Sequence, residues 1–318
     1  MRAVRIHEFG GPEVLRVETV AKPEPKAGET LVRVTAAGVN FLDVYQRTGL
    51  YNVDLPFAPG MEGAGVVEQS ANFAPGDRVA WAQHPGAYAE SAVIPDEKLL
   101  PIPPGVNDET AAAVMLQGIT AQYLCESTYP VKEGDRVLVH AGAGGVGLLL
   151  IQLLKHKGAS VYTTVSNPRK AQLAKEAGAD AAILYTETDF AATVRELTSG
   201  GGVQVVYDSV GKATYEGSLN VLKPLGMLVL FGQSSGRVPP IDPLTLTAKG
   251  SLFLTRPSLA HYIADRAALQ ERGQRVLGWV ADGTLKVRIE KTFALEDLPK
   301  AHQELENRQT TGKLVVLM

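Results

Sequence analysis

The sequence predicts an α/β protein in which a doubly wound parallel sheet is inserted into a mainly β domain. From about residue 124 to residue 265, short β-branched apolar runs alternate with helical segments, which is typical of a parallel sheet with right-handed crossovers. The first of these runs leads directly into a glycine-rich turn. Before it, short β runs are separated by Pro and Gly, as in a barrel-like β domain.

The glycine-rich turn reads Gly142-x-Gly144-x-x-Gly147 and lies between an apolar strand (137–139) and an apolar helix (148–154). That order is the context of a dinucleotide fingerprint. Gly142 permits a tight turn, Gly144 lets the backbone approach a pyrophosphate, and Gly147 allows close packing of helix and strand. The first-turn N–H groups and the helix dipole then hold the phosphates. The alternative is a structural glycine turn without a ligand.

The second strand, 160–165, ends without the acid that bonds the ribose 2′-hydroxyl in NAD sites. Ser166 follows instead, and Arg169 and Lys170 come shortly after it. A serine and a basic pair can bind a 2′-phosphate, so the pattern predicts NADP. The alternative is that Asn167 caps a helix with ordinary surface charges, and this is compatible with the first interpretation.

The alternation continues to the end of the central segment. Because ligands lie beyond the carboxyl ends of parallel strands, we expect Ser209, Gly211 and the loop 232–236 to face the cofactor. Each could also be ordinary loop chemistry. The further strands are expected at 181–185, 203–208 and 226–232, and the helices at 168–178, 189–197 and 215–222.

The flanking segments are expected to form one domain. The last run, 313–318, is an apolar strand that needs a sheet partner, so we expect the tail to fold back onto the first domain. This predicts a domain of residues 1–123 plus 266–318, an inserted domain of residues 124–265, and an active cleft between them. Strands are expected at 31–35, 65–68, 77–82 and 88–94, and a helix at 267–278, followed by the segments 287–293 and 298–308.

Composition excludes several classes of protein. With 318 residues, 45% hydrophobic, and a net charge of −3, the chain is long enough for two domains and has no basic stripe for nucleic acid. No signal peptide or membrane-spanning run is expected. The single cysteine, Cys125, allows no intrachain disulfide and no four-cysteine zinc site, which fits the cytoplasm. The six histidines are scattered, so we predict no metal, and we expect Cys125 to be a quiet core thiol.

The chain resembles the medium-chain dehydrogenases/reductases, specifically the zeta-crystallin-like quinone oxidoreductases, over nearly its whole length. Zinc-using relatives carry Cys at or near Asn40 and Gly-His-Glu where this chain has Gly60-Met61-Glu62, so the resemblance implies a metal-free enzyme. It also implies a Rossmann domain inserted into a GroES-like domain. The matching motifs are AAGVNFLDVYQRTGLY (36–51), GMEGAG (60–65), HAGAGGVG (140–147), YDSVG (207–211), FGQSSG (231–236) and TRPSL (255–259).

The resemblance implies NADPH-dependent reduction of a quinone or similar conjugated carbonyl. Tyr185 could instead be a strand-end aromatic packed on the next helix, and Arg308 would be read as a surface arginine without the resemblance. The residues expected to hold NADPH are Asn40, Phe41, Asp43, Tyr45, Gly142, Gly144, Gly145, Val146, Gly147, Ser166, Arg169, Lys170, Tyr185, Ser209, Gly232, Gln233, Ser234, Ser235, Gly236 and Arg308.

The expected catalytic residues are Asn40, Asp43, Tyr45 and Tyr51. Because the cofactor performs hydride transfer, the protein must supply a hydrogen-bond donor for the charge that develops on the acceptor oxygen. The Asn40 amide and the Tyr45 hydroxyl are the candidates, Asp43 could orient either, and Tyr51 is a second pocket aromatic. Asn40 could instead be a turn former, and Tyr45 a residue packed on a helix face.

Two other functions stay open at this point. The same hydride geometry would serve reduction of an enal or enone. A crystallin-like protein that binds NADPH without turnover is the other. The apolar segment 251–255 could be an edge strand that pairs with a second copy, so we expect a homodimer through the edge of the parallel sheet.

Overall fold

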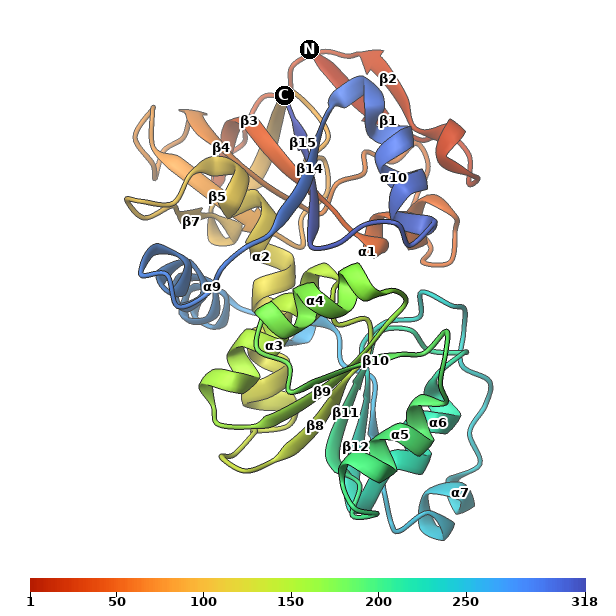
Figure 1. The fold of residues 1–318 in the computed structure, drawn as a ribbon. Helices are drawn as coiled ribbons and strands as arrows, with labels where there is room; N and C mark the ends of the chain where they lie inside the picture. Colours follow the sequence, from red (N-terminus) through yellow and green to blue (C-terminus); the bar gives the residue numbers. More distant parts are fainter. The chain divides into compact units, whose positions relative to one another are not determined.

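The structure is a computed structural model that describes all 318 residues, Met1–Met318. Its internal contacts divide the chain into two compact units. We call Met1–Ile119 with Tyr262–Met318 the split unit, and Thr120–His261, which interrupts it, the inserted unit. In Figure 1 the inserted unit follows the colours from yellow-green to cyan.

The inserted unit is built on a six-stranded sheet in which every pair of neighbours is parallel. The chain enters it at the centre, extends to one edge, crosses back and extends to the other, so the topological switch point lies between β8 and β11. This confirms the predicted doubly wound sheet. In spatial order the strands are β10 (Ala181–Leu184), β9 (Ser160–Val165), β8 (Arg136–Val139), β11 (Val203–Asp208), β12 (Leu222–Leu230) and β13 (Phe253–Thr255).

Helices cover this sheet in pairs: α3 packs against α4, and α5 packs against α6 (Figure 1). Leu138, Val206 and Leu228 of the sheet pack in one core with Val194 of α5 and Leu219 of α6. The helices are α3 (Gly145–His156), α4 (Pro168–Glu176), α5 (Phe190–Leu197), α6 (Tyr215–Val221), α7 (Pro243–Ala248) and α8 (Leu259–Tyr262), with a π-helical turn η3 (Leu124–Thr128).

Two elements of the inserted unit begin earlier than the sequence predicts. Helix α3 starts at Gly145 rather than at residue 148, because the glycine turn itself forms the first helical turn although glycine has a poor helix propensity. Strand β12 starts at Leu222 rather than at residue 226.

The split unit contains a seven-stranded sheet and a small two-stranded one. The tail strand β15 pairs antiparallel with β3, with Leu314 opposite Val39, which confirms that the tail folds back onto the first segment. The large sheet has the order β14 (Ile289–Ala294), β15 (Lys313–Leu317), β3 (Glu29–Val39), β4 (Glu62–Gln69), β5 (Arg78–Ala82), β7 (Leu100–Pro101), with β6 (Ser91–Pro95) also on β3; β1 (Arg2–Arg5) pairs with β2 (Arg16–Thr19).

The core of the split unit packs Trp81, Tyr88 and Ile94 against Val316 and its neighbours. Helix α2 is not among the predicted elements, because residues 111–115 and 118–123 are all buried, so it shows no amphipathic stripe. No helix of the structure is both long and apolar enough to cross a membrane. The helices are α1 (Phe41–Arg47), α2 (Asp108–Tyr123), α9 (Arg266–Ala281) and α10 (Leu298–Glu306), with 3-10 turns η1 (Pro12–Val14), η2 (Asp96–Lys98) and η4 (Leu295–Asp297).

Candidate functional site

The glycine turn places a helix N-terminus at the switch point of the inserted sheet. Gly144 is the N-cap of α3, and the first bond inside the helix joins the Leu148 amide to the Gly144 carbonyl at 2.9 Å. The amides of Gly145, Val146 and Gly147 therefore have no acceptor within the helix. Together with the positive end of the helix dipole, they form an arrangement that suits an anionic phosphate group.

The three fingerprint glycines differ in why they are needed. A Cβ on Gly142 would lie 2.8 Å from the Thr163 Cβ, and a Cβ on Gly147 would lie 2.9 Å from the Gly142 Cα, so both are required by close packing. A Cβ on Gly144 would meet only the Ala141 carbonyl, at 3.2 Å. The residue of the turn with left-handed backbone is Ala141, with φ 55°. Contrary to the prediction, the tight turn therefore does not depend on the conformational freedom of Gly142.

The loops that follow β11 and β12 are joined by hydrogen bonds. The Ser234 amide donates to the Ser209 carbonyl at 3.1 Å, and the Ser235 hydroxyl donates to the Val210 carbonyl at 2.7 Å. Gly232 approaches this loop so closely that a Cβ there would lie 2.6 Å from the Ser209 carbonyl oxygen. The predicted residues of the two loops thus lie side by side at the carboxyl edge of the sheet.

The predicted 2′-phosphate residues gather at the ends of β9 and β10. The parallel register of these strands pairs Val165 with Leu184, so Ser166 and Tyr185 follow at the same edge of the sheet. The Asn167 side chain accepts from the Lys170 amide at 2.9 Å, which confirms the predicted cap and directs the start of α4 toward this edge. The Tyr185 side chain is 44% exposed, which leaves its ring available to a ligand.

A buried polar network, which no local sequence pattern predicts, joins the glycine turn to the end of β9 and to the loop after β11. His140, just before the glycine turn, contacts the Thr164 hydroxyl through Nδ1 at 2.8 Å and the Ser218 hydroxyl through Nε2 at 3.0 Å. Ser218 donates to Asp208 at 2.9 Å, and Asp208 also accepts from the Gly211 amide at 2.9 Å. Burial lowers the pKa of His140, so the imidazole is neutral and braces the loops rather than reacting.

In the split unit, helix α1 and the turn after it carry the three predicted aromatic residues of the site. The rings of Phe41 and Tyr45 lie 6.1 Å apart, and those of Tyr45 and Tyr51 lie 5.2 Å apart at 56°. The Tyr51 amide donates to the Tyr45 carbonyl at 2.9 Å, which holds the turn against the helix. We call Phe41, Tyr45 and Tyr51 the aromatic group; it combines flat apolar faces with two phenolic hydroxyls.

Asn40, the N-cap of α1, is buried, and its amide is engaged at both ends. Its Nδ2 donates to Glu62 Oε1 at 2.8 Å, and its Oδ1 accepts from Lys313 Nζ at 2.7 Å. Lys313 and Glu62 also form an ion pair with each other. The proposed donor to a substrate oxygen is thus an amide that already has partners inside the protein, and its catalytic role stays a prediction.

Asp43 is fully buried, so it is not an ordinary surface carboxylate. Its Oδ2 accepts from the Asn40 amide at 2.8 Å and from the Tyr88 hydroxyl at 2.6 Å, whereas its Oδ1 has no hydrogen-bond partner. Burial raises the pKa of the Asp43 carboxyl to about 6, although both hydrogen bonds and Lys313 oppose the shift. The sequence analysis missed Lys313 and Tyr88, because a lysine at the start of an apolar strand usually marks its exposed boundary.

The remaining predicted residues are more scattered. Arg308 follows α10 on the surface of the split unit in the left-handed region, with φ 56°. Cys125 is buried, and burial raises the pKa of its thiol to about 12, so it is unreactive. No three His, Cys, Asp or Glu side chains of the chain are grouped so as to hold a metal ion.

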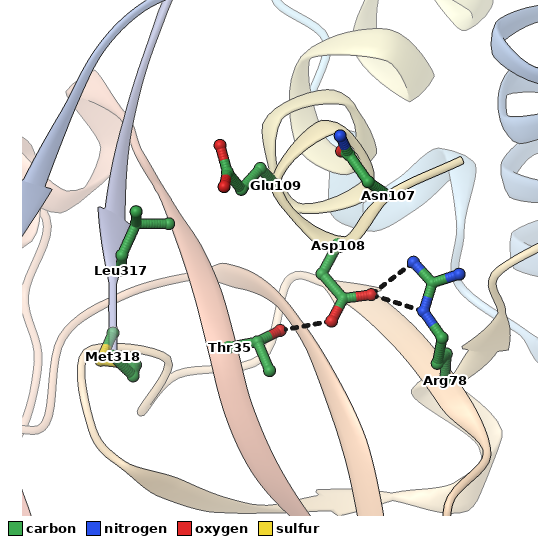
Figure 2. A pocket seen from close by; sticks show the side chains of 7 residues that line it. All are labelled: Thr35, Arg78, Asn107, Asp108, Glu109, Leu317 and Met318. Atoms are coloured by element: carbon green, nitrogen blue, oxygen red, sulfur yellow. Dashed lines mark hydrogen bonds and ion pairs between the residues drawn. The ribbon is translucent and has the colours of Figure 1, made fainter. Parts of the chain in front are cut away.

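A hollow of about 450 Å³ lies in the split unit beside the start of α2, and no predicted site residue lines it (Figure 2). Arg78 Nε donates to Asp108 Oδ1 at 2.7 Å, and the Thr35 hydroxyl donates to Asp108 Oδ2 at 2.8 Å. The charged side chains at its centre, Arg78 and Asp108, are therefore paired with each other, and we assign no ligand to this hollow. The other lining residues are Asn107, Glu109, Leu317 and Met318.

Fold and site together define a nucleotide-binding α/β protein of two units. The description "Alcohol dehydrogenase GroES-like domain" matches residues 26–104, and "Zinc-binding dehydrogenase" matches residues 145–265. A quinone oxidoreductase of Pseudomonas aeruginosa is 44% identical and a 2-haloacrylate reductase of a Burkholderia species is 41% identical, each over at least 98% of both chains. The crystal structure of Escherichia coli quinone oxidoreductase complexed with NADPH is 40% identical over both full chains, with a TM-score of 0.97. The chain belongs to the medium-chain dehydrogenase/reductase family, within its group of quinone oxidoreductases.

Proposed function

We propose that this protein is an NADPH-dependent reductase that transfers a hydride to a quinone without a metal ion. The observation that carries the proposal is the pairing of a glycine turn at the switch point with a serine and two basic residues at the end of β9. The glycine turn fits a pyrophosphate, because Gly147 lets the first turn of α3 pack directly on the backbone of Gly142, and Gly144 leaves the backbone accessible. The names of the relatives support the same cofactor and substrate class.

Separate parts of the site bind the cofactor, hold the acceptor and stabilise the charge that develops on it. NADPH, when bound, supplies the hydride. The first-turn amides of α3 bind its pyrophosphate, and Ser166, Arg169 and Lys170 bind its 2′-phosphate. The aromatic group presents a flat surface to a planar acceptor and excludes water from it. The Tyr45 hydroxyl donates a hydrogen bond to the acceptor oxygen on which negative charge develops, and solvent can complete the protonation.

The cofactor assignment is tested by Lys170→Glu, measured as NADPH and NADH consumption with a para-quinone. We expect the KM for NADPH to rise about tenfold or more, because one charge-assisted hydrogen bond contributes roughly 1.5–3 kcal/mol, while the KM for NADH changes little. Lys175→Glu, an exposed lysine of the same helix, is the matched control. An equal rise in both KM values would exclude the 2′-phosphate role.

A second candidate is reduction of a conjugated carbon–carbon double bond, which the similarity to the 2-haloacrylate reductase favours. The same hydride geometry would serve a 2-haloacrylate, an enone or an enal. Steady-state rates with a quinone, a 2-haloacrylate and an α,β-unsaturated aldehyde, each with NADPH, rank these substrates. Tight NADPH binding without turnover of any of them would instead support a crystallin-like binding role.

We also propose a homodimer formed through the edge of the inserted sheet. Strand β13 is the last strand of that sheet, and its Phe253 and Leu254 side chains are 55% and 37% exposed. An exposed apolar edge strand is a template for pairing with a second copy. Light scattering should give twice the chain mass for the wild type and the chain mass for Leu254→Lys.

Two further assignments belong to this proposal. Residues 1–123 plus 266–318 act as the GroES-like catalytic domain and residues 124–265 as the NADP-binding domain. The single cysteine fits a reducing compartment, so we place the protein in the cytoplasm. Fractionation of the source cells tests that placement.

A further inference from the structure

We propose that Lys313 is a positioning residue for the reaction proposed above: its buried ammonium, together with Glu62, holds Asn40 and the start of α1 so that the aromatic group keeps its place. The inference rests on the proposed function for its catalytic meaning. Its structural basis lies entirely within the split unit.

The Lys313 cluster is a closed set of buried polar atoms on three neighbouring strands. Lys313 opens β15, Asn40 follows β3 and Glu62 opens β4. Glu62 Oε1 accepts from both Lys313 and Asn40, and Glu62 Oε2 accepts from the Leu116 amide of α2 at 2.7 Å. Lys313 is 1% exposed and Glu62 is fully buried, so water replaces none of these contacts.

The absence of a side chain at Gly38 of β3 leaves room for the ion pair of Lys313 and Glu62. A Cβ on Gly38 would lie 2.6 Å from the Lys313 Cε and 2.7 Å from the Glu62 Cδ, so only glycine fits at that position of β3. A buried ion pair is often no more stabilising than a well-packed apolar pair of the same volume. Stability alone therefore does not account for a lysine here, whereas a fixed orientation of Asn40 does.

The effect of Lys313 reaches α1 through Asn40. With its Oδ1 bound to Lys313 and its Nδ2 bound to Glu62, the Asn40 side chain has one orientation. The Asn40 backbone amide in turn donates to Asp43 in the first turn of α1, and Tyr88 holds the same carboxylate oxygen. Tyr45 lies one turn after Phe41 on this helix, so a displaced helix start would move the aromatic group.

The pKa of Asp43 provides a second measurement of the role of Lys313, because nearby charges shift it. The groups that face Asp43 are the Tyr88 hydroxyl and the Asn40 amide, with Lys313 lowering and Glu62 raising its pKa. The neutral ring of His302 on α10 lies 6.2 Å from the Tyr88 ring. Removing the Lys313 charge should therefore raise the titration midpoint of Asp43, and removing both charges should largely restore it.

The experiment compares the full-length protein with Lys313→Met and with the double variant Lys313→Met/Glu62→Gln. Methionine replaces the unbranched stem of the lysine without its ammonium, and the double variant leaves no uncompensated charge in this ion pair, so it should be more stable than the single variant. Lys291→Met, which removes a half-exposed lysine of the adjacent strand β14, is the control. The measurements are kcat and KM, the melting temperature, the carboxyl ¹³C titration of Asp43 and the ring resonances of Tyr45 and Tyr51.

We expect Lys313→Met to lower kcat about tenfold or more, as small misplacements of a positioning group do, and to raise the Asp43 midpoint. The double variant should recover the melting temperature but not kcat, and its tyrosine resonances should stay displaced. Wild-type kcat in the double variant, or unmoved tyrosine resonances in both variants, would overturn the proposal. The wild-type rate in the same assay tests the proposed function separately, because the resonances and the titration report positioning even in a protein without turnover.

Discussion

The unfolding free energy of Asp43→Asn, relative to that of the wild type, should increase as the pH rises. The asparagine oxygen can accept from the Asn40 amide and from the Tyr88 hydroxyl, as the carboxylate does. Its NH₂ group would take the place of Oδ1, which is buried without a partner. The substitution thus keeps the hydrogen bonds and removes a charge that burial disfavours.

The size of the effect follows from the raised pKa of Asp43, about 6 in the folded protein against an ordinary value of 3.8. The shift corresponds to about 3 kcal/mol, because each pKa unit is about 1.4 kcal/mol. A raised pKa means that the folded state favours the protonated acid. Its stabilising contribution is complete below pH 3.8 and is lost as the pH rises through 6. The advantage of Asp43→Asn in unfolding free energy should grow by about 2 kcal/mol between pH 4 and pH 7.

Urea unfolding followed by tryptophan fluorescence measures this advantage. Both tryptophans, Trp81 and Trp279, lie in the split unit, so the signal reports the unit that contains Asp43. Asp54→Asn, which removes an exposed carboxylate of the same unit, is the control. A difference between Asp43→Asn and wild type that is flat or falls with rising pH would refute the reasoning.

Four further substitutions test the surroundings of single residues. Gly147→Ala should abolish measurable NADPH binding in calorimetry, because its Cβ would lie 2.9 Å from the Gly142 Cα; Gly278→Ala, a helical glycine with nothing within 4 Å, should instead raise stability by about 1 kcal/mol. Burial lowers the pKa of His302 to about 3, so the folded state resists its protonation and loses stability as the pH falls below 6.5. His302→Asn should reduce that loss of unfolding free energy by about 3 kcal/mol between pH 6.5 and pH 4, as measured by urea unfolding. The same loss in the variant as in the wild type would contradict the prediction. Tyr45→Phe should lower kcat with a quinone but leave the NADPH dissociation constant unchanged; an unaltered kcat would remove Tyr45 from the mechanism.

The inserted sheet was predictable because its signals are local. The β-branched run at residues 160–165 forms β9 without a change of boundary, and the run at 203–208 forms β11 likewise. The cap at Asn167 and the proline after it start α4 where the sequence predicts. In each case, neighbouring residues alone determine the backbone preference or the pattern of burial.

The support of the candidate site was not predictable, because it depends on long-range pairing. Lys313 and Glu62 are 251 positions apart and meet only through the register of β15 and β3 against β4. His140, Ser218 and Asp208 are likewise brought together by the sheet and α6. A single lysine or histidine in the sequence carries no mark of the buried partner it will find.

The origin of β15 at the far end of the chain has a consequence for synthesis on the ribosome. Between the emergence of Glu62 and that of Lys313, 251 residues must be translated, which takes roughly 10–50 s at common elongation rates. During this interval the segment of β3 that later pairs with β15 is an open edge, and the Glu62 carboxylate lacks its cation. All residues of the inserted unit are therefore made while the unit around it still lacks β15, so the nascent split unit keeps an unpaired strand edge until its last strand is translated.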